Sequence, residues 1–217
     1  MADTNISASA KGATFLILLQ IGSRALTFAL NQILLRYLSP SILGIAVQLE
    51  LYCISVLYFS RESLRVALQR RTDGGVQAVV NLAYLALAAG PVVAFVLAAL
   101  YLRTNVPDVP YLDYSVSLYG VAAVVELTAE PAFVAAQQLS AYKVRARAEA
   151  AATVVKTILT AGLVIKWSRE GSSTGVLAFA YGQLAYAACL LVIYTWEMGR
   201  IASVSTFSLL PRKIEST

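Results

Sequence analysis

The sequence contains no histidine, only two cysteines and few charged residues. Without histidine, the chain cannot build histidine-ligated metal sites, Ser-His-Asp triads or imidazole proton relays. Cys53 and Cys189 both fall inside apolar segments, where a thiol behaves as a small core residue, and two cysteines make no disulfide framework. These absences exclude much enzyme chemistry and predict no cofactor, while they leave the redox compartment open.

Charge is scarce as well, because 13% of the residues are charged and 59% are hydrophobic. A soluble domain needs a more charged surface, so this composition excludes one. The hydrophobic residues form blocks of about 18 to 27 residues, the helix length that crosses ~30 Å of hydrocarbon. The sequence therefore predicts an all-α integral membrane protein with about six transmembrane helices.

The predicted spans form a single membrane domain, residues 1–217, without internal repeats or a soluble linker. They cover residues 12–38, 41–60, 76–102, 112–139, 148–165 and 174–198, and residues 199–217 form a tail. The charged stretch from Arg61 to Gly75 is predicted to be a loop. Pro131 has no backbone N–H to donate, so we expect a kink near Glu130 in the fourth span.

The net charge of +5 would suit a nucleic-acid partner only if the basic residues shared one face. They lie instead in short segments between the spans, so no nucleic-acid partner is predicted. With the N-terminus in the cytosol, the cytosolic segments carry Lys11, Arg61, Arg65, Arg70, Arg71, Lys143, Arg145, Arg147, Arg200, Arg212 and Lys213, against Arg36, Arg103, Lys166 and Arg169 opposite. This bias predicts that both termini are cytosolic.

Ionisable residues inside the spans carry the functional information, because each costs at least ~2.5 kcal/mol at the bilayer centre. They are Arg24, Glu50, Glu126, Glu130 and Lys156. Three polar stripes accompany them at helical spacing: Gln20, Arg24, Thr27 and Asn31; Glu126, Glu130 and Gln137; and Thr153, Lys156, Thr157 and Thr160. Three stripes on three helices predict a shared hydrophilic interior.

Depth along the helix axes suggests how these charges pair. Arg24 and Glu126 lie at one predicted depth, and Glu130 and Lys156 at another, so each acid has a base at its own level. Such pairs could merely hold the bundle together, or they could bind a ligand, and both alternatives stay open. Glu50 has no evident partner and its role is left open. The basic residues after the second span, namely Arg61, Arg65, Arg70 and Arg71, are expected at the membrane surface, where they set topology and contact anionic lipid.

Several segments, in this order, resemble the Rft family of the multidrug/oligosaccharidyl-lipid/polysaccharide (MOP) exporter superfamily. They are Leu18-Leu19-Gln20 with Arg24, Leu35-Arg36-Tyr37-Leu38-Ser39, Arg61-Glu62-Ser63-Leu64-Arg65-Val66-Ala67, Val124-Val125-Glu126-Leu127-Thr128-Ala129-Glu130-Pro131 and Tyr142-Lys143-Val144-Arg145-Ala146-Arg147-Ala148-Glu149. Arg24, Arg36 and Arg61 match the family's characteristic arginines, and Glu126 and Glu130 match its acidic pair.

The resemblance implies an endoplasmic reticulum membrane protein that moves dolichol-pyrophosphate-linked oligosaccharide (Man5GlcNAc2-PP-dolichol type) to the luminal leaflet for N-glycosylation. Family members are about twice as long and have two helical lobes, so the chain is expected to be the first lobe of a MOP-type transporter, cut before a C-terminal lobe. The resemblance leaves open whether the protein flips the lipid or assists indirectly.

In this leading hypothesis, a cationic interior binds the pyrophosphate while the acyl chain stays among membrane lipids. Its substrate-binding residues would be Arg24, Gln20, Asn31, Arg36, Arg61, Glu126, Glu130 and Lys156. Two other functions compete with it. The alternative is a non-transporting scaffold or assembly partner whose charges are internal pairs. An intramembrane enzyme ranks last, because the sequence offers no reaction centre.

Overall fold

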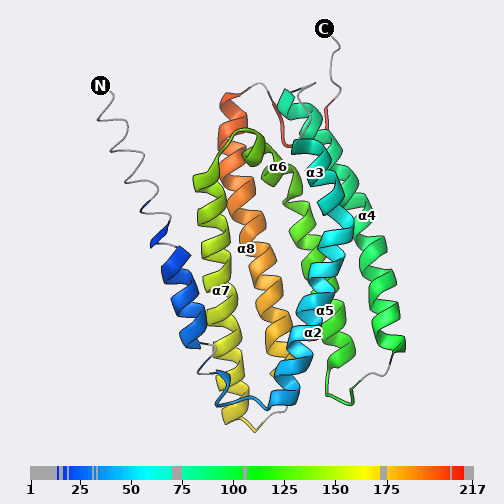
Figure 1. Cartoon of the computed structure of the whole chain (residues 1–217), viewed down its shortest axis with the longest axis vertical. Helices are drawn as coiled ribbons and strands as arrows, with labels where there is room; N and C mark the ends of the chain where they lie inside the picture. The colour runs from blue at the N-terminus through cyan, green and yellow to red at the C-terminus, as the bar shows by residue number, and fades with distance from the viewer. Residues whose placement is uncertain are drawn as a thin grey trace.

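A computed structural model provides the structure and describes residues 14, 17–18, 20–30, 32, 34–69, 75–104, 107–171, 175–205 and 207–212. The helical elements are α2 (Pro40–Leu57), the π-helical turn η1 (Tyr58–Glu62), α3 (Ser63–Gln69), α4 (Gly75–Arg103), α5 (Leu112–Thr128), α6 (Glu130–Gln138), α7 (Tyr142–Arg169) and α8 (Gly175–Val204). Residues 20–30 are helical too and lie beside α7 (Figure 1). All regular elements in the described part of the chain are helical, as predicted.

The long helices form one bundle whose axes run roughly along the long direction of the molecule (Figure 1). Four helical segments are long and apolar enough to cross a membrane: Pro40–Ala67, Gly75–Arg103, Tyr142–Arg169 and Val176–Val204. The number of candidate spans rises to five if α5 and α6, which are bent relative to each other, together form one span. The structure thus confirms an all-α chain with several candidate spans. Six spans stay a prediction, because the first predicted span, 12–38, lies partly outside the described residues.

The second span continues beyond its predicted end. Pro40 starts α2 after the N-cap Ser39, whose side chain accepts a hydrogen bond from the Ile42 amide. At Tyr58 the helix widens into the π-helical turn and then continues as α3. Residues 61–69 are therefore helical, not the predicted loop. A π-helical turn changes the direction in which the following side chains project from the helix. This matters because Arg61 lies in the turn and Arg65 follows it.

The fourth span breaks where the sequence predicted a kink. Ala129 separates α5 from α6, and the two helices are bent by 40°. Pro131 lies in the first turn of α6, where its missing N–H needs no intrahelical partner. The kink near Glu130 is confirmed, and it places Glu126 in the last turn of α5 and Glu130 at the start of α6.

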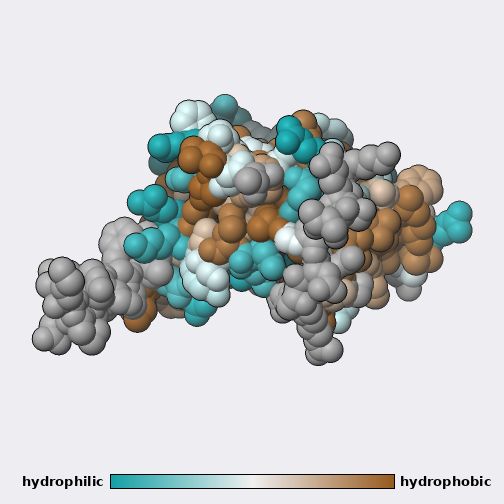
Figure 2. Space-filling view, turned by 90° about the horizontal axis from the view of Figure 1, so that it is seen from above, coloured by the Kyte–Doolittle hydropathy of each residue, from teal (hydrophilic) through white to brown (hydrophobic). Residues whose placement is uncertain are grey.

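Small residues allow the helices to approach closely, as in other membrane bundles. The buried core is rich in alanine, and a methyl group at Gly182 of α8 would collide with the Thr160 side chain of α7. Hydrophobic residues dominate the flank on the α4 side when the bundle is viewed from the α6 end (Figure 2). Exposed members of that flank are Leu85, Val92, Phe95, Val96 and Leu100. This flank is suited to contact lipid.

The chain after α8 is fastened to α4 by side chains that bind its backbone. Gln77 accepts from the Ser208 amide at 2.7 Å and donates to the Leu210 carbonyl at 3.1 Å. Asn81 makes the same kind of paired contact with the Arg212 backbone, at 3.1 and 2.6 Å. Residues 207–212 therefore pack on the bundle at the end that carries α6, whereas the sequence suggested only a tail.

Candidate functional site

A cavity of about 760 Å³ lies among α2, α7 and α8, with further walls from α5 and the N-terminal helical residues. We call it the central cavity. Its polar and charged lining consists of Thr27, Glu50, Cys53, Arg61, Glu126, Thr153, Lys156, Thr157, Thr160, Gln183 and Tyr186. The predicted stripe on the fifth span, Thr153 to Thr160, lies entirely on its wall. The other two stripes each contribute one described residue, Thr27 and Glu126, and apolar side chains of α2 and its neighbours complete the wall. The prediction of a shared polar interior is therefore confirmed only in part.

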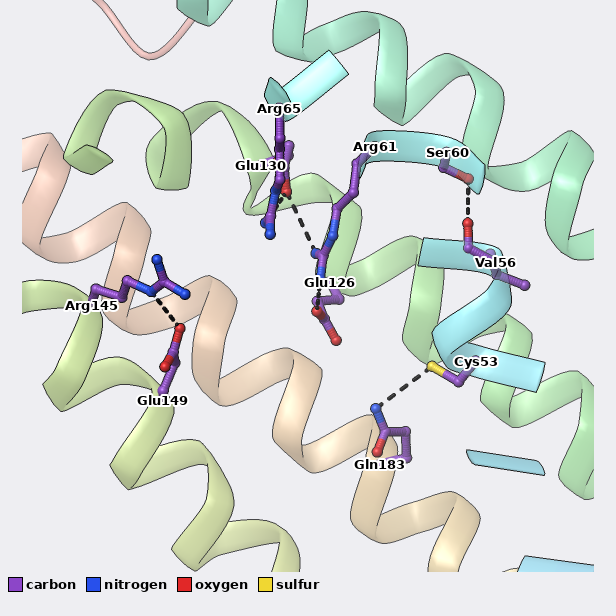
Figure 3. A network of polar contacts seen from close by, with 10 residues as sticks. All are labelled: Cys53, Val56, Ser60, Arg61, Arg65, Glu126, Glu130, Arg145, Glu149 and Gln183. Atoms are coloured by element: carbon purple, nitrogen blue, oxygen red, sulfur yellow. Dashed lines mark hydrogen bonds and ion pairs between the residues drawn. The ribbon is translucent and has the colours of Figure 1, made fainter. Parts of the chain in front are cut away.

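Two arginines and two glutamates form a buried cluster at one end of the central cavity (Figure 3). Arg61 Nη2 lies 2.8 Å from Glu126 Oε1, and Arg61 Nη1 lies 3.5 Å from Glu130 Oε2. Arg65 holds Glu130 with two bonds, from Nε to Oε1 and from Nη2 to Oε2 at 2.7 Å. The Glu130 side chain is only 2% exposed, so both of its oxygens are paired within the protein.

The Arg65 guanidinium also lies over the Phe133 ring, 3.8 Å from its centroid. Such a cation–π contact stabilises a desolvated charge. Arg65 is thus fixed on two sides, by a carboxylate and by an aromatic face, and its place in the cluster is structural.

A second ion pair joins α2 to α7 within the central cavity. Lys156 Nζ donates to Glu50 Oε1 at 2.8 Å. Here the glutamate side chain is 50% exposed and the lysine 22%. This pair faces open space and can rearrange more easily than the buried cluster.

A lateral groove of about 470 Å³ separates the N-terminal helical residues from α7. Gln20, Ser23, Arg24 and Thr27 line one side, and Glu149 and Thr153 are on the other. Thr27 and Thr153 also line the central cavity, so the groove and the cavity adjoin. Arg24 is exposed in this groove, while Glu149 is paired with Arg145 at 2.8 Å.

The pairings predicted from depth are wrong. Glu126 pairs with Arg61, not with Arg24, and Lys156 pairs with Glu50, not with Glu130. Depth fixes the height of a residue but not its direction around the bundle. In addition, the helix continues through Arg61, so the arginines after the second span turn inward. Arg61 and Arg65 were expected to contact anionic lipid, but their side chains are only 16% exposed and are paired with Glu126 and Glu130 inside the protein.

The predicted site residues fall into three groups. Arg61, Glu126 and Lys156 line the central cavity, and Glu130 lies beside it in the buried cluster. Gln20 and Arg24 line the lateral groove instead. Arg36 is exposed in the turn before α2, and Asn31 lies outside the described residues.

Sequence reasoning left Glu50 without a role, assigned Arg65 to the membrane surface, and did not single out Gln183. The signal for Arg65 was present, since Arg61 and Arg65 are four residues apart, as are Glu126 and Glu130. Two complementary pairs at helical spacing predict a four-membered cluster. Gln183 offered no such signal, because a single glutamine in an apolar helix can face any direction.

The charges that line the central cavity balance. Glu50 and Glu126 oppose Lys156 and Arg61, and each acid is bonded to one of these bases. The prediction of a cationic interior is therefore wrong for the described lining. The cavity offers hydrogen-bonding groups of both kinds without a net charge.

A helical bundle with hydrophobic flanks and a partly open cavity lined by both polar and apolar side chains is typical of multi-pass membrane proteins. The chain belongs to the Rft protein family, whose model matches residues 8–217. No solved structure matches the chain.

Similar proteins include the Man(5)GlcNAc(2)-PP-dolichol translocation proteins of three organisms. The Yarrowia lipolytica protein is 37% identical over 97% of this chain and 34% of its own length. The Xenopus tropicalis protein is 35% identical over 85% of this chain and 34% of its own length. The Saccharomyces cerevisiae protein is 31% identical over 87% of this chain and 39% of its own length. The chain thus spans between a third and two fifths of the length of these relatives.

Proposed function

We propose that the chain is one lobe of a MOP-type carrier that translocates dolichol-pyrophosphate-linked oligosaccharide across the endoplasmic reticulum membrane and so supports N-glycosylation. The names of its relatives describe them as Man(5)GlcNAc(2)-PP-dolichol translocation proteins, that is, as transport proteins rather than enzymes. The proposal includes a second lobe facing the central cavity, and both termini in the cytosol. No observation favours a non-transporting scaffold over this function.

The single observation that carries the proposal is the central cavity. A glycan head group cannot cross ~30 Å of hydrocarbon without polar partners for its hydroxyls. The central cavity supplies such partners between helices whose outer faces are hydrophobic. Its volume of about 760 Å³ lies within the ~300–1,000 Å³ of small-ligand sites.

The lateral groove is the proposed place for the pyrophosphate. Arg24 offers a guanidinium fork suited to bidentate phosphate binding, and the neighbouring Gln20 can donate from its amide. Arg61, Glu126 and Lys156 would line the path of the head group, and Glu130 would hold Arg61 and Arg65 in place. No role is proposed for Arg36, which is exposed outside the central cavity, or for Asn31.

A chimera tests this function in cells. The matched part of the Saccharomyces cerevisiae relative is replaced by this chain, and glycosylation of a reporter protein is measured in cells that lack the native protein. We expect the chimera to restore glycosylation, and Arg61→Glu to abolish it because a third carboxylate would then lie beside Glu126 and Glu130. Arg103→Glu, at the exposed end of α4, is the matched control and should retain activity.

The proposal is contradicted if the chimera inserts at normal abundance and leaves the reporter unglycosylated. The chain expressed by itself should insert but restore nothing, since a cleft between two lobes needs both walls. Full rescue by residues 1–217 alone would show that a single lobe suffices.

A further inference from the structure

The open pair of the central cavity, Lys156 with Glu50, leaves most of its hydrogen-bonding capacity unused. A lysine ammonium has three donors, and the described contacts give Lys156 Nζ one acceptor, Glu50 Oε1 at 2.8 Å. Within the same part of the chain, Glu50 also bonds through only one of its two oxygens. The Glu130 carboxylate of the buried cluster, by contrast, has both oxygens bonded to arginine. The open pair can therefore accept a further partner, whereas the buried cluster cannot.

The two members of the open pair are anchored unequally. The Lys156 side chain is 22% exposed, and its ammonium lies 5.9 Å from the centre of the Tyr186 ring, where a cation–π contact still attracts it. The Glu50 side chain is 50% exposed, and its hydrogen bond among the described residues is the one from Lys156. A half-exposed carboxylate is hydrated when it leaves its partner, so the separation costs little free energy. Glu50 is thus the member that can move away while Lys156 stays in the wall.

Movement of Glu50 changes the charge of the central cavity. With the pair closed, the lining is neutral, because Glu50 and Glu126 balance Lys156 and Arg61. Without Glu50, two bases face one acid, and the lining has one net positive charge. Glu126 is bonded to Arg61 at 2.8 Å, so it cannot replace Glu50 at Lys156 without breaking that contact. The open state of the pair therefore attracts an anion, and the closed state does not.

The lateral groove leads an anion to this position. Thr27 and Thr153 line both the groove and the central cavity. Arg24 lies three residues before Thr27, and Lys156 lies three residues after Thr153. Residues three apart on a helix are neighbours on one face, so each base lies one turn from a threonine at the junction of the two spaces. A phosphate group held by Arg24 is therefore at the entrance of a route to Lys156.

We infer that Glu50 is a displaceable counter-ion, and that the diphosphate group of the translocated lipid takes its place on Lys156 in the central cavity. This inference rests on the proposed function and deepens it, because it adds a second phosphate position to that of Arg24 in the lateral groove. A diphosphate has more charge than a carboxylate and several oxygens for the unused donors of Lys156. Entry of the ligand exchanges one anion for another, so Lys156 never remains in the wall without a counter-charge.

Binding of diphosphates to the whole chain in phosphatidylcholine nanodiscs tests this exchange. The probes are radiolabelled inorganic pyrophosphate and farnesyl diphosphate, which distinguish a free phosphate from one attached to an isoprenoid lipid, and farnesol is the uncharged control. The variants are Glu50→Gln and Lys156→Gln, made separately and together. Glu197→Gln is the matched control, because it removes one carboxylate from an ion pair, with Arg147 at 3.9 Å, outside the lining of the central cavity. Thermal unfolding establishes that each variant is folded before binding is compared.

The two single variants should change binding in opposite directions. Glu50→Gln removes the competing carboxylate and should lower the dissociation constants of both diphosphates by about tenfold, the size of one charged hydrogen bond. Lys156→Gln removes the cation and should raise them by about tenfold. The double variant should bind as weakly as Lys156→Gln alone. Glu197→Gln should leave both constants unchanged, and no variant should change the binding of farnesol.

A purely structural ion pair gives another pattern, because the loss of either partner then weakens the site. Weaker or unchanged binding in Glu50→Gln overturns the inference, and so does undiminished binding in Lys156→Gln. Binding of pyrophosphate without binding of farnesyl diphosphate contradicts the assignment to a lipid, and the absence of binding by both probes overturns the inference entirely. The proposed function is judged separately by the chimera: rescue of glycosylation alongside any of these results contradicts the inference alone.

Discussion

The two ion-pair sites of the central cavity use the same chemistry in different surroundings. In the buried cluster, Arg61 and Arg65 form ion pairs with Glu126 and Glu130, whose side chains are 8% and 2% exposed. In the open pair, Lys156 forms an ion pair with Glu50, whose side chain is half exposed. A buried charge depends on its partner, whereas an exposed one can be hydrated instead. The cluster therefore holds helices together, and the open pair can yield to a ligand.

The buried cluster should respond most strongly to mutation. Glu130→Gln keeps the shape of the side chain but leaves Arg65 without a counter-charge. The free energy of unfolding should therefore fall by about 3 to 5 kcal/mol. The measurement is the equilibrium unfolding of the chain in detergent micelles.

A paired replacement separates the charge from the fold. Arg65→Met together with Glu130→Met removes both charges and should recover most of the lost stability, since apolar side chains replace buried pairs at little cost. If the double variant is no more stable than Glu130→Gln alone, the cluster is not a self-contained pair network.

The open pair should respond far less. Glu50→Gln removes a half-exposed partner, so we expect a change below about 1 kcal/mol in the same unfolding measurement. The small effect should shrink further as the salt concentration rises. A loss as large as that of Glu130→Gln would erase the distinction between the two sites.

The smallest effect is expected from coupling between Arg24 and Glu126. The two residues line different spaces, and Glu126 is bonded to Arg61. In a double-mutant cycle with Arg24→Gln and Glu126→Gln, the unfolding free energies should add within about 0.5 kcal/mol. A larger coupling energy would show that Arg24 and Glu126 interact, as their equal predicted depth in the membrane suggested.

Much of the fold was predictable, because hydrophobic block length and turn residues act locally. The kink at Pro131 and the polar wall of the fifth span both followed from such patterns. The site was less predictable, since ion pairing depends on how helices are rotated about their axes. The π-helical turn at Tyr58–Glu62, which precedes Arg65, has no clear sequence signature, and it decides where two arginines point.

The central claim is that water and ligand lie inside the bundle while its outer face meets lipid. Two positions on α7 test it: Thr153, which lines the central cavity, and Ile158, which is 56% exposed. Each is changed to cysteine in a chain with Cys53→Ser and Cys189→Ser, and its reaction with a charged, water-soluble thiol reagent is timed in membranes.

The account predicts that Thr153→Cys reacts at least about tenfold faster than Ile158→Cys, although Ile158 is the more exposed side chain, because a thiol surrounded by hydrocarbon stays protonated and unreactive. Equal rates, or a faster reaction at Ile158→Cys, would contradict the claim that the polar interior is the wet side of this membrane protein.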